Sequence, residues 1–297
     1  MKILLFGKNG QVGWELQRSL APLGELIALD RHSTEWCGDI SNLNGIAETI
    51  RNVAPDVIVN AAAHTAVDKA ESEPELAQTL NSLAPSVMAK AAAAINAWLI
   101  HYSTDYVFGG GGEKPWQEND PVAPLSVYGT TKLEGEQRIQ QSGCKHLIFR
   151  TSWVYATRGG NFAKTMLRLA QERDKLSVIN DQIGAPTGAD LIADVTAHAI
   201  RTAYQQPQVS GSYHLVAGGE TTWHGYASYV IDAARQAGVP IKVAQDDIQP
   251  VPTSAFPTPA KRPINSRMDA TKLQHTFDLK LPLWQTGVSR MLAEILD

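Results

Sequence analysis

The stretch Ile3-Leu-Leu-Phe-Gly7-Lys-Asn-Gly10-Gln-Val-Gly13 joins an apolar run to a glycine-rich turn and then to a helical pattern. Glycines permit a tight turn and a close approach of the backbone to a phosphate, while the N-terminus of the next helix supplies free N–H groups. The spacing is Gly-x-x-Gly-x-x-Gly, which differs from the Gly-x-Gly-x-x-Gly of commoner dinucleotide sites. Because it lies between a strand and a helix, we expect Gly7, Gly10 and Gly13 to bind a dinucleotide.

The residues after the second apolar run bear on which dinucleotide fits. That run ends at Asp30, about twenty residues beyond the glycine turn, where a carboxylate can bond a ribose hydroxyl. Arg31 follows immediately and is suited to a 2′-phosphate, so NADH and NADPH both remain open. Asp39 and Ile40 would lie near the adenine. Alternatively, Asp39 is a turn residue before a helix capped by Ser41.

Short apolar runs alternate with helical patterns through the first half of the chain. Such alternation predicts βαβ units around a parallel sheet. The expected strands are 3–6, 26–29, 56–59, 98–102 and 147–149, and the expected helices are 12–21, one after Ser41, 74–95 and 126–141. We therefore predict an α/β fold, with a Rossmann-type doubly wound parallel sheet in residues 1–150. Residues 151–297 are expected to form mainly a smaller mixed α/β substrate-binding domain, with some segments returning to the Rossmann domain.

The second half of the chain changes character after a predicted strand at 213–216. Five prolines forbid a continuous helix between residues 249 and 263: Pro250, Pro252, Pro257, Pro259 and Pro263. We interpret this segment as a loop that crosses the domain interface. A final helix is expected at 283–296.

Composition limits the kinds of partner. The 297 residues are 43% hydrophobic and 19% charged, which is typical of a soluble globular protein. A net charge of −4 argues against nucleic-acid binding. Cys37 and Cys144 are the only cysteines, which fits a reducing compartment. No apolar stretch approaches the ~18 residues of a membrane helix. We therefore expect a cytoplasmic protein that binds neither nucleic acid nor membrane.

The stretch Tyr128-Gly-Thr-Thr-Lys132 is the candidate for chemistry. Residues four apart are neighbours on a helix surface, so the phenol and the ammonium of a helix capped by Ser126 can meet. A nearby cation favours the phenolate and lowers the pKa of a tyrosine. This pattern predicts ketone reduction with a nicotinamide cofactor. Taken alone, however, the same spacing also occurs on ordinary helix surfaces.

Three longer motifs carry a resemblance to a known family: Asn60-Ala-Ala-Ala-His-Thr-Ala-Val-Asp-Lys-Ala-Glu71, Ser103-Thr-Asp-Tyr-Val-Phe108 and Asp181-Gln-Ile-Gly-Ala-Pro-Thr187. Together with the glycine turn and the tyrosine–lysine pair, they resemble the extended short-chain dehydrogenase/reductases over essentially the whole chain. Within that group they are similar to the dTDP-4-dehydrorhamnose reductases. One departure is His64, where an aromatic residue such as tyrosine is expected. We expect it to alter cofactor contacts only slightly.

The resemblance implies a set of site residues. For the cofactor these are Gly10, Gln11, Val12, Asp30, Asp39, Ile40, Ala62, Ala63, His64, Thr65, Tyr102, Tyr128 and Lys132. Thr104 and Asp105 would face the sugar, and Trp153 would pack on the sugar or its diphosphate. Arg262 is a candidate for the diphosphate because a guanidinium forks onto phosphate oxygens. The alternative for Arg262 is an exposed loop cation, and the alternative for Trp153 is a core aromatic.

The resemblance also implies a reaction. NADPH or NADH would reduce the C4 ketone of dTDP-4-dehydro-L-rhamnose to give dTDP-L-rhamnose, the last step of its synthesis. Tyr128 would donate the proton, Lys132 would bond the nicotinamide ribose, and Thr104 would bond the developing alkoxide. A nucleotide-sugar dehydratase or epimerase is one rival, although a dehydratase needs a carboxylate base where this chain has Tyr106. A non-catalytic dinucleotide-binding regulatory subunit is the other.

The sequence also bears on metal binding and assembly. The eight histidines show no metal-ligand spacing. The resemblance implies that some members carry Mg²⁺ on surface carboxylates and form homodimers, with Glu15 and Asp190 as candidate ligands here. The alternative is that both are solvated helix charges. Whether the rhamnose enters the O-antigen of lipopolysaccharide or another glycan is left open.

Overall fold

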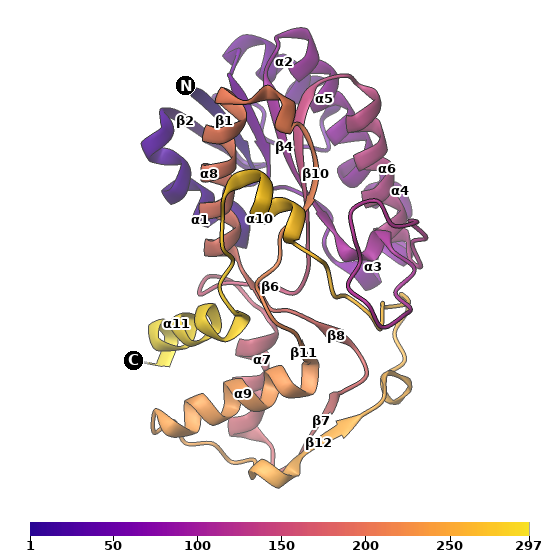
Figure 1. Ribbon diagram of the computed structural model, residues 1–297, viewed down its shortest axis with the longest axis vertical. Helices are drawn as coiled ribbons and strands as arrows, with labels where there is room; N and C mark the ends of the chain where they lie inside the picture. The colour runs from indigo at the N-terminus through magenta and orange to yellow at the C-terminus, as the bar shows by residue number, and fades with distance from the viewer. Residues whose placement is uncertain (297) are drawn as a thin grey trace.

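A six-stranded parallel sheet lies in the upper half of the protein as drawn in Figure 1, in the strand order β10-β5-β4-β3-β1-β2. The computed structural model describes residues 1–296. The strands are β1 (Lys2–Phe6), β2 (Glu25–Leu29), β3 (Val57–Asn60), β4 (Trp98–Thr104), β5 (Lys145–Thr151) and β10 (Gly211–His214). Every neighbouring pair in this sheet is parallel. The predicted Rossmann-type α/β fold is confirmed.

Helices cover both faces of the sheet, as doubly wound folds require. Ile3 and Leu5 of β1 pack in one apolar cluster, and Leu4 and Phe6 pack in another on the opposite face. The first face carries α1 (Gln11–Leu20), α8 (Ala189–Gln205) and α10 (Thr271–Phe277), and the second carries α2 (Leu43–Val53), α5 (Ala84–Ala94) and α6 (Val127–Gln141). Two shorter helices, α3 (Val67–Ser72) and α4 (Pro74–Gln78), precede α5. None of the helices in residues 1–296 is both long and apolar enough to cross a bilayer.

The two predicted helix caps have different outcomes. Ser126 caps α6, because its hydroxyl accepts a hydrogen bond from Gly129 N at 3.2 Å. Ser41 does not cap α2, so that prediction is wrong. The Ser41 N–H donates to the Asp39 carboxylate at 3.0 Å. Asn42, one residue after Ser41, is the cap, and the helix begins at Leu43.

The helix expected at 74–95 is interrupted. A π-helical turn, Thr79–Leu83, separates α4 from α5. Helix α6 comes very close to this turn, since a Cβ at Gly135 would lie 2.2 Å from the carbonyl oxygen of Asn81. Such turns are rare and occur frequently at functional sites.

Residues from the second half of the chain build a separate core beyond the carboxyl ends of the strands, in the lower half of Figure 1. Its helices are α7 (Phe162–Glu172), α9 (Trp223–Gln236) and α11 (Trp284–Leu296). Its strands form short pairs: β6 (Val154–Tyr155) with β9 (Thr187–Gly188), β8 (Ile183–Gly184) with β11 (Thr221–Thr222), and β7 (Leu176–Ile179) with β12 (Ile248–Val251). The proline-rich segment is thus not all loop, because β12 contains Pro250. A two-stranded pair has only edge strands, where proline is tolerated.

Candidate active site

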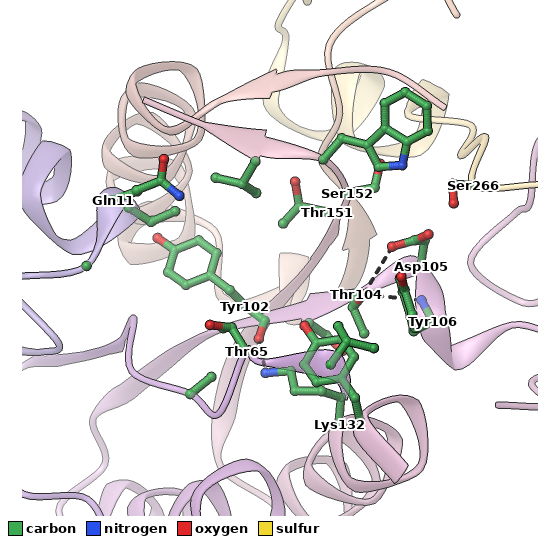
Figure 2. Close-up of a pocket in the computed structure, with 18 of the residues that line it drawn as sticks. Gln11, Thr65, Tyr102, Thr104, Asp105, Tyr106, Lys132, Thr151, Ser152 and Ser266 are labelled. Carbon is green, nitrogen blue, oxygen red and sulfur yellow. Dashed lines mark hydrogen bonds between the residues drawn. The ribbon is translucent and has the colours of Figure 1, made fainter. Parts of the chain in front are cut away.

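A cavity of about 650 Å³ lies at the carboxyl ends of the central strands, between the sheet and the second core (Figure 2). It brings together most of the residues predicted for the site: Gly7, Gly10, Gln11, Val12, Ala62, Ala63, Thr65, Tyr102, Thr104, Asp105, Tyr128, Lys132, Trp153 and Arg262. The lining also includes residues to which the sequence analysis gave no binding role, among them Asn60, Thr151, Ser152, Gln182, Trp223 and Ser266. Predicted residues outside this wall are Gly13, Asp30, Arg31, Asp39, Ile40, His64, Glu15 and Asp190.

The glycine turn forms one end of the cavity. Gly7 has φ +89°, and a Cβ there would lie 2.7 Å from Ala62 N. Gly13 packs behind the turn, where a Cβ would lie 2.0 Å from the Gly7 carbonyl oxygen. Helix α1 begins after Gly10 with no side chain capping its first N–H groups, and Gln11 Oε1 is buried without a partner among the described residues. Free donors and an unpaired amide oxygen fit a dinucleotide.

The predicted ribose acid lies at the neighbouring strand end. Asp30 follows β2 and accepts hydrogen bonds from His32 N at 2.9 Å and from the side chains of Asn9 and Ser33. Burial alone would raise the pKa of Asp30, but the His32 N–H and the Lys8 ammonium hold it below its ordinary value. Arg31 is exposed beside it, with Nε 3.1 Å from His32 Nε2. The structure therefore leaves both a carboxylate and a guanidinium at this end of the sheet.

Asp39 and Ile40 do not reach the cavity wall. The Asp39 carboxylate is used locally, accepting from both the backbone N–H and the hydroxyl of Ser41. This is the geometry of the turn residue that was the alternative for Asp39. Ile40 is buried in the apolar cluster that contains α2.

Helix α6 brings Tyr128 and Lys132 to the cavity, as their spacing predicts. Lys132 is 2% exposed, and its ammonium group donates to the Tyr102 carbonyl oxygen. Nζ also lies 3.2 Å from His101 Nε2. Burial lowers the pKa of Lys132 to about 8, with the negative charge of Glu136 acting in the opposite direction.

The predicted direction of the Tyr128 pKa is wrong for this structure. Burial raises the pKa of Tyr128 to about 12, and a hydrogen bond with Thr104 only partly opposes that effect. The sequence revealed a neighbouring lysine but not the desolvation of the phenol, which is the larger influence. Tyr128 is therefore fully protonated at neutral pH, which is the form that an acid needs.

Thr104 and Asp105 form a buried polar pair beside the phenol. Thr104 Oγ1 donates to Asp105 Oδ1 at 3.0 Å and accepts from Tyr106 N at 3.2 Å; Figure 2 draws both bonds. Burial raises the pKa of Asp105 to about 6, and the nearby hydroxyls of Ser266 and Thr104 act in the opposite direction. Its Oδ2 has no partner among the described residues. Asp105 is also the one carboxylate among the described lining residues.

Two stacked tryptophans form the opposite end of the cavity. The rings of Trp153 and Trp223 are 3.6 Å apart and nearly parallel, at 14°. Trp223 Nε1 donates to Gln182 Oε1 at 3.0 Å, and Gly184 has no room for a Cβ, which would lie 2.8 Å from the Trp153 ring. Trp153 has φ +50°, a left-handed conformation that is rare for a bulky residue. The sequence motif around Gln182 was recognised without a role, and nothing in the sequence singled out Trp223.

Arg262 lines the cavity and is also paired. Arg262 lies at the end of the proline-rich segment, and its guanidinium is 2.7 Å from Asp68 Oδ2 of α3. Both side chains are about one-third exposed, at 34% and 38%. Arg262 Nε has no partner among the described residues. The side chain thus combines features of both predicted alternatives, a loop cation and a group facing the cavity.

His64 lies behind the wall, not in it. Its Nε2 is 3.1 Å from Glu73 Oε2, and its backbone N–H donates to Asn81 Oδ1 at 2.8 Å. Asn81 Nδ2 in turn donates to Thr131 Oγ1 of α6 at 3.3 Å. Asn81, in the π-helical turn, therefore ties the segment after β3 to the helix of Tyr128. The sequence gave no signal for this residue.

Glu15 and Asp190, the candidate metal ligands, line a separate small cavity of about 40 Å³. Glu15 lies 3.5 Å from Arg18 Nε, and Asp190 Oδ1 accepts from Leu191 N at 2.8 Å. Within residues 1–296 there is no group of three or more His, Cys, Asp or Glu side chains suited to hold a metal ion. The structure does not support the magnesium site.

Comparison with known proteins shows the family of the chain. A family model described as the RmlD substrate binding domain matches residues 1–296. The chain is 67% identical to the dTDP-4-dehydrorhamnose reductase of Salmonella typhimurium, covering 99% of this chain and 98% of that protein. The crystal structure of such a reductase from Bacillus anthracis in complex with NADP is 33% identical, with a TM-score of 0.87 and 99% of both chains covered. A Clostridium acetobutylicum reductase structure is 34% identical over 100% of both chains, also with a TM-score of 0.87. The chain therefore belongs to the RmlD family of extended short-chain dehydrogenase/reductases.

Proposed function

We propose that this protein reduces the C4 ketone of dTDP-4-dehydro-L-rhamnose to dTDP-L-rhamnose, the last step of dTDP-rhamnose synthesis. The observation that carries the proposal is that Thr104, Tyr128 and Lys132 meet in one cavity, with the glycine turn at one end and two tryptophans at the other. The high identity to reductases of that name supports the choice of substrate. Bound NADPH or NADH supplies the hydride.

Each group has a distinct task in this proposal. Tyr128, which is protonated at neutral pH, donates its proton to the oxygen at C4 as the alkoxide forms. The Thr104 hydroxyl bonds the same oxygen as it gains charge. Lys132 bonds the nicotinamide ribose, since its nitrogen faces the cavity beyond its contacts with Tyr102 and His101.

The other site residues divide between the two ligands. Gly7, Gly10, Gln11 and Val12 would hold the pyrophosphate, with Ala62, Ala63 and Thr65 beside it. The unpaired Oδ2 of Asp105 suits a sugar hydroxyl. Trp153 and Trp223 would pack on the sugar nucleotide, and Arg262 would bond its diphosphate. The pairing of Arg262 with Asp68 would have to loosen when the diphosphate binds.

The rival activities differ from reduction in cofactor balance. A dehydratase or an epimerase returns the nicotinamide to its starting state in each cycle, whereas a reductase consumes it. Tyr106 occupies the place where a dehydratase needs its base, and Asp105 is already hydrogen-bonded to Thr104. A regulatory subunit would have no need for a matched tyrosine, threonine and lysine.

Absorbance of the reduced nicotinamide tests the proposal. Purified protein is mixed with dTDP-4-dehydro-L-rhamnose generated in situ and with NADPH or NADH. We expect one cofactor to be oxidised for each dTDP-L-rhamnose formed, and the two rates rank the cofactors. Cofactor binding without oxidation would favour an epimerase or the regulatory subunit.

Domain division and assembly extend the proposal. We infer a dinucleotide-binding domain in residues 1–150 and mainly a substrate-binding domain in residues 151–297. β10 is an edge strand of the central sheet, and α8 and α10 pack on one face of that sheet. Both observations support the return of later segments to the first domain. Family resemblance supports a cytoplasmic homodimer, and light scattering on the purified protein would measure its oligomeric state.

A further inference from the structure

The first turn of α6, which carries Tyr128, is held by a residue from another helix. Val127 is the first residue of α6, and its backbone N–H donates to Glu71 Oε1 at 2.9 Å. Glu71 belongs to α3, 56 residues earlier in the chain. The first N–H groups of a helix have no partner within the helix, so other groups must accept from them. Glu71 therefore caps the helix of Tyr128 from outside that helix.

Helix α6 has no glutamate of its own for this task. In a capping box, the residue at the third helical position sends its side chain back to the start of the helix. In α6 that position is Gly129, where a Cβ would lie 2.3 Å from the Tyr106 carbonyl oxygen. This close contact leaves no room for a side chain at residue 129, so the carboxylate comes from α3 instead. A carboxylate at this end of a helix also interacts favourably with the helix dipole.

The Glu71 contact bears on Tyr128 more than on Lys132. Tyr128 is the second residue of α6 and lies in its first turn. Lys132 lies one turn further along, and its ammonium group has partners of its own on β4. Helix ends are the parts that open most easily. Loss of the Glu71 contact would therefore move the phenol and leave the lysine in its place.

We propose that Glu71 is a positioning residue for Tyr128, because its hydrogen bond to Val127 N holds the first turn of α6 against the segment after β4. Thr104 caps the short turn in that segment. Tyr106, in the same turn, meets the ring of Tyr128 edge to face, with centroids 5.4 Å apart. A misplacement of about 1 Å at a reacting group can cost ~10²-fold in rate. The inference rests on the proposed role of Tyr128 as the acid, but the hydrogen bond exists whatever the reaction.

Two substitutions remove this hydrogen bond from opposite sides. Glu71→Ala removes the acceptor, and Val127→Pro removes the donor. Proline suits the first position of a helix, and Ser126 already has the extended conformation, φ −142° and ψ 162°, that a residue before proline favours. Glu71→Gln keeps an acceptor oxygen of the same reach. Glu75→Ala is the control, because Glu75 is an exposed glutamate in the next helix, α4.

Steady-state kinetics separate positioning from a general loss of structure. We expect kcat to fall about 10- to 100-fold in Glu71→Ala and in Val127→Pro, while the Kd of NADPH stays unchanged. The double variant should fall no further than either single variant, because both changes remove the same contact. Glu71→Gln should keep kcat within about threefold of the unmodified protein, and Glu75→Ala should match it. Additive losses in the double variant, or a loss of NADPH affinity in step with kcat, would overturn the inference.

Carbon NMR of the intact protein labelled with ¹³C-tyrosine tests the positioning without turnover. The signal of Tyr128 is assigned by its loss in Tyr128→Phe. We expect that signal to shift in Glu71→Ala and in Val127→Pro, and to keep its position in Glu71→Gln. If one of the first two variants does not fold, the other decides, and an unchanged Tyr128 signal would overturn the inference. If the signals behave as expected while the unmodified protein does not reduce the ketone, the proposed function is wrong and the positioning stands.

Discussion

The two ends of the cavity are built in different ways. The glycine wall (Gly7, Gly10, Gln11, Val12, Ala61, Ala62, Ala63 and Thr65) follows two adjacent parallel strands, β1 and β3. The tryptophan wall (Trp153, Gln182, Trp223, Arg262 and Ser266) is drawn from separated segments that meet through side-chain contacts. Tyr128 and Thr104 lie between the two walls.

The two walls owe their shapes to different interactions. The backbone of the glycine wall is held by β1 and β3, which are buried except for Lys2, so its shape follows from strand pairing. The tryptophan wall has only two-residue strands beside it, and its shape depends on the stack of Trp153 on Trp223. We therefore expect changes in the second wall to affect the sugar nucleotide while leaving the dinucleotide in place. Five variants and one control test the roles of the two walls and of the residues between them.

Tyr128→Phe should give the largest effect, because it removes the proton donor between the walls. We expect turnover to fall ~10²-fold or more, which is typical for loss of a positioned acid. Both walls stay intact, so affinity for NADPH and for the sugar nucleotide should change little. Steady-state kinetics with titration of the cofactor by fluorescence separates these quantities. Near-normal turnover would rule out Tyr128 as the acid.

Asp105→Asn should stabilise the folded protein while lowering its activity. A folded-state pKa of about 6, against an ordinary 3.8, means that this carboxyl favours folding in its protonated form. Its contribution is full below about pH 4 and is lost as the pH rises to about 6. Asparagine avoids the cost of the buried charge, so at pH 7 we expect a gain of up to about 3 kcal/mol in the free energy of unfolding.

Urea denaturation of both proteins at pH 4 and pH 7 measures this effect. The difference between them should be present at pH 7 and small at pH 4. A variant that is less stable at pH 7 would show that the hydrogen bonds of Asp105 outweigh its burial.

Gly13→Ala and Gly184→Ala are a matched pair, one for each wall. The first places a methyl group 2.0 Å from a backbone oxygen, and the second places one 2.8 Å from the Trp153 ring. Overpacking typically costs about 1–3 kcal/mol in the free energy of unfolding. Relief of the overlap moves the adjacent wall of the cavity, so we expect Gly13→Ala to weaken NADPH binding and Gly184→Ala to weaken only binding of the sugar nucleotide. Calorimetry with each ligand distinguishes the two variants. If either variant lost affinity for both ligands equally, the two walls would not bind their ligands independently.

Trp223→Ala should give a smaller effect, confined to one ligand. It removes the ring that supports Trp153, so we expect the KM for the sugar nucleotide to rise by about 10-fold, the scale of one lost stacking contact. Trp223→Phe keeps an aromatic ring and serves as the control, with a rise of a few-fold. NADPH affinity should match that of the unmodified protein in both variants. A loss of NADPH affinity in step with the rise in KM would show that the two walls do not act independently.

The same contrast explains how much the sequence could predict. Buried parallel strands appear as apolar runs, and the glycine turn has a fixed spacing, so the sheet and that turn were predicted from local patterns. Ala62, Ala63 and Thr65 came from the family resemblance instead. Trp223 and Ser266 are unremarkable in their own segments and gain a role only through contacts across the chain. Asn81 and His101 are just as unremarkable in the sequence, since each contacts site segments from behind the cavity wall. The pKa of Tyr128 was predicted in the wrong direction because spacing reveals a neighbour but not burial.

Transfer of deuterium distinguishes direct reduction at C4 from the rival activities. The protein is given dTDP-4-dehydro-L-rhamnose and NADPH that carries deuterium at the transferable position, and the product is analysed by mass spectrometry and proton NMR. We expect one deuterium in each dTDP-L-rhamnose, located at C4, with an equal amount of oxidised cofactor. A product without deuterium, or deuterium returned to the cofactor, would contradict direct reduction at C4.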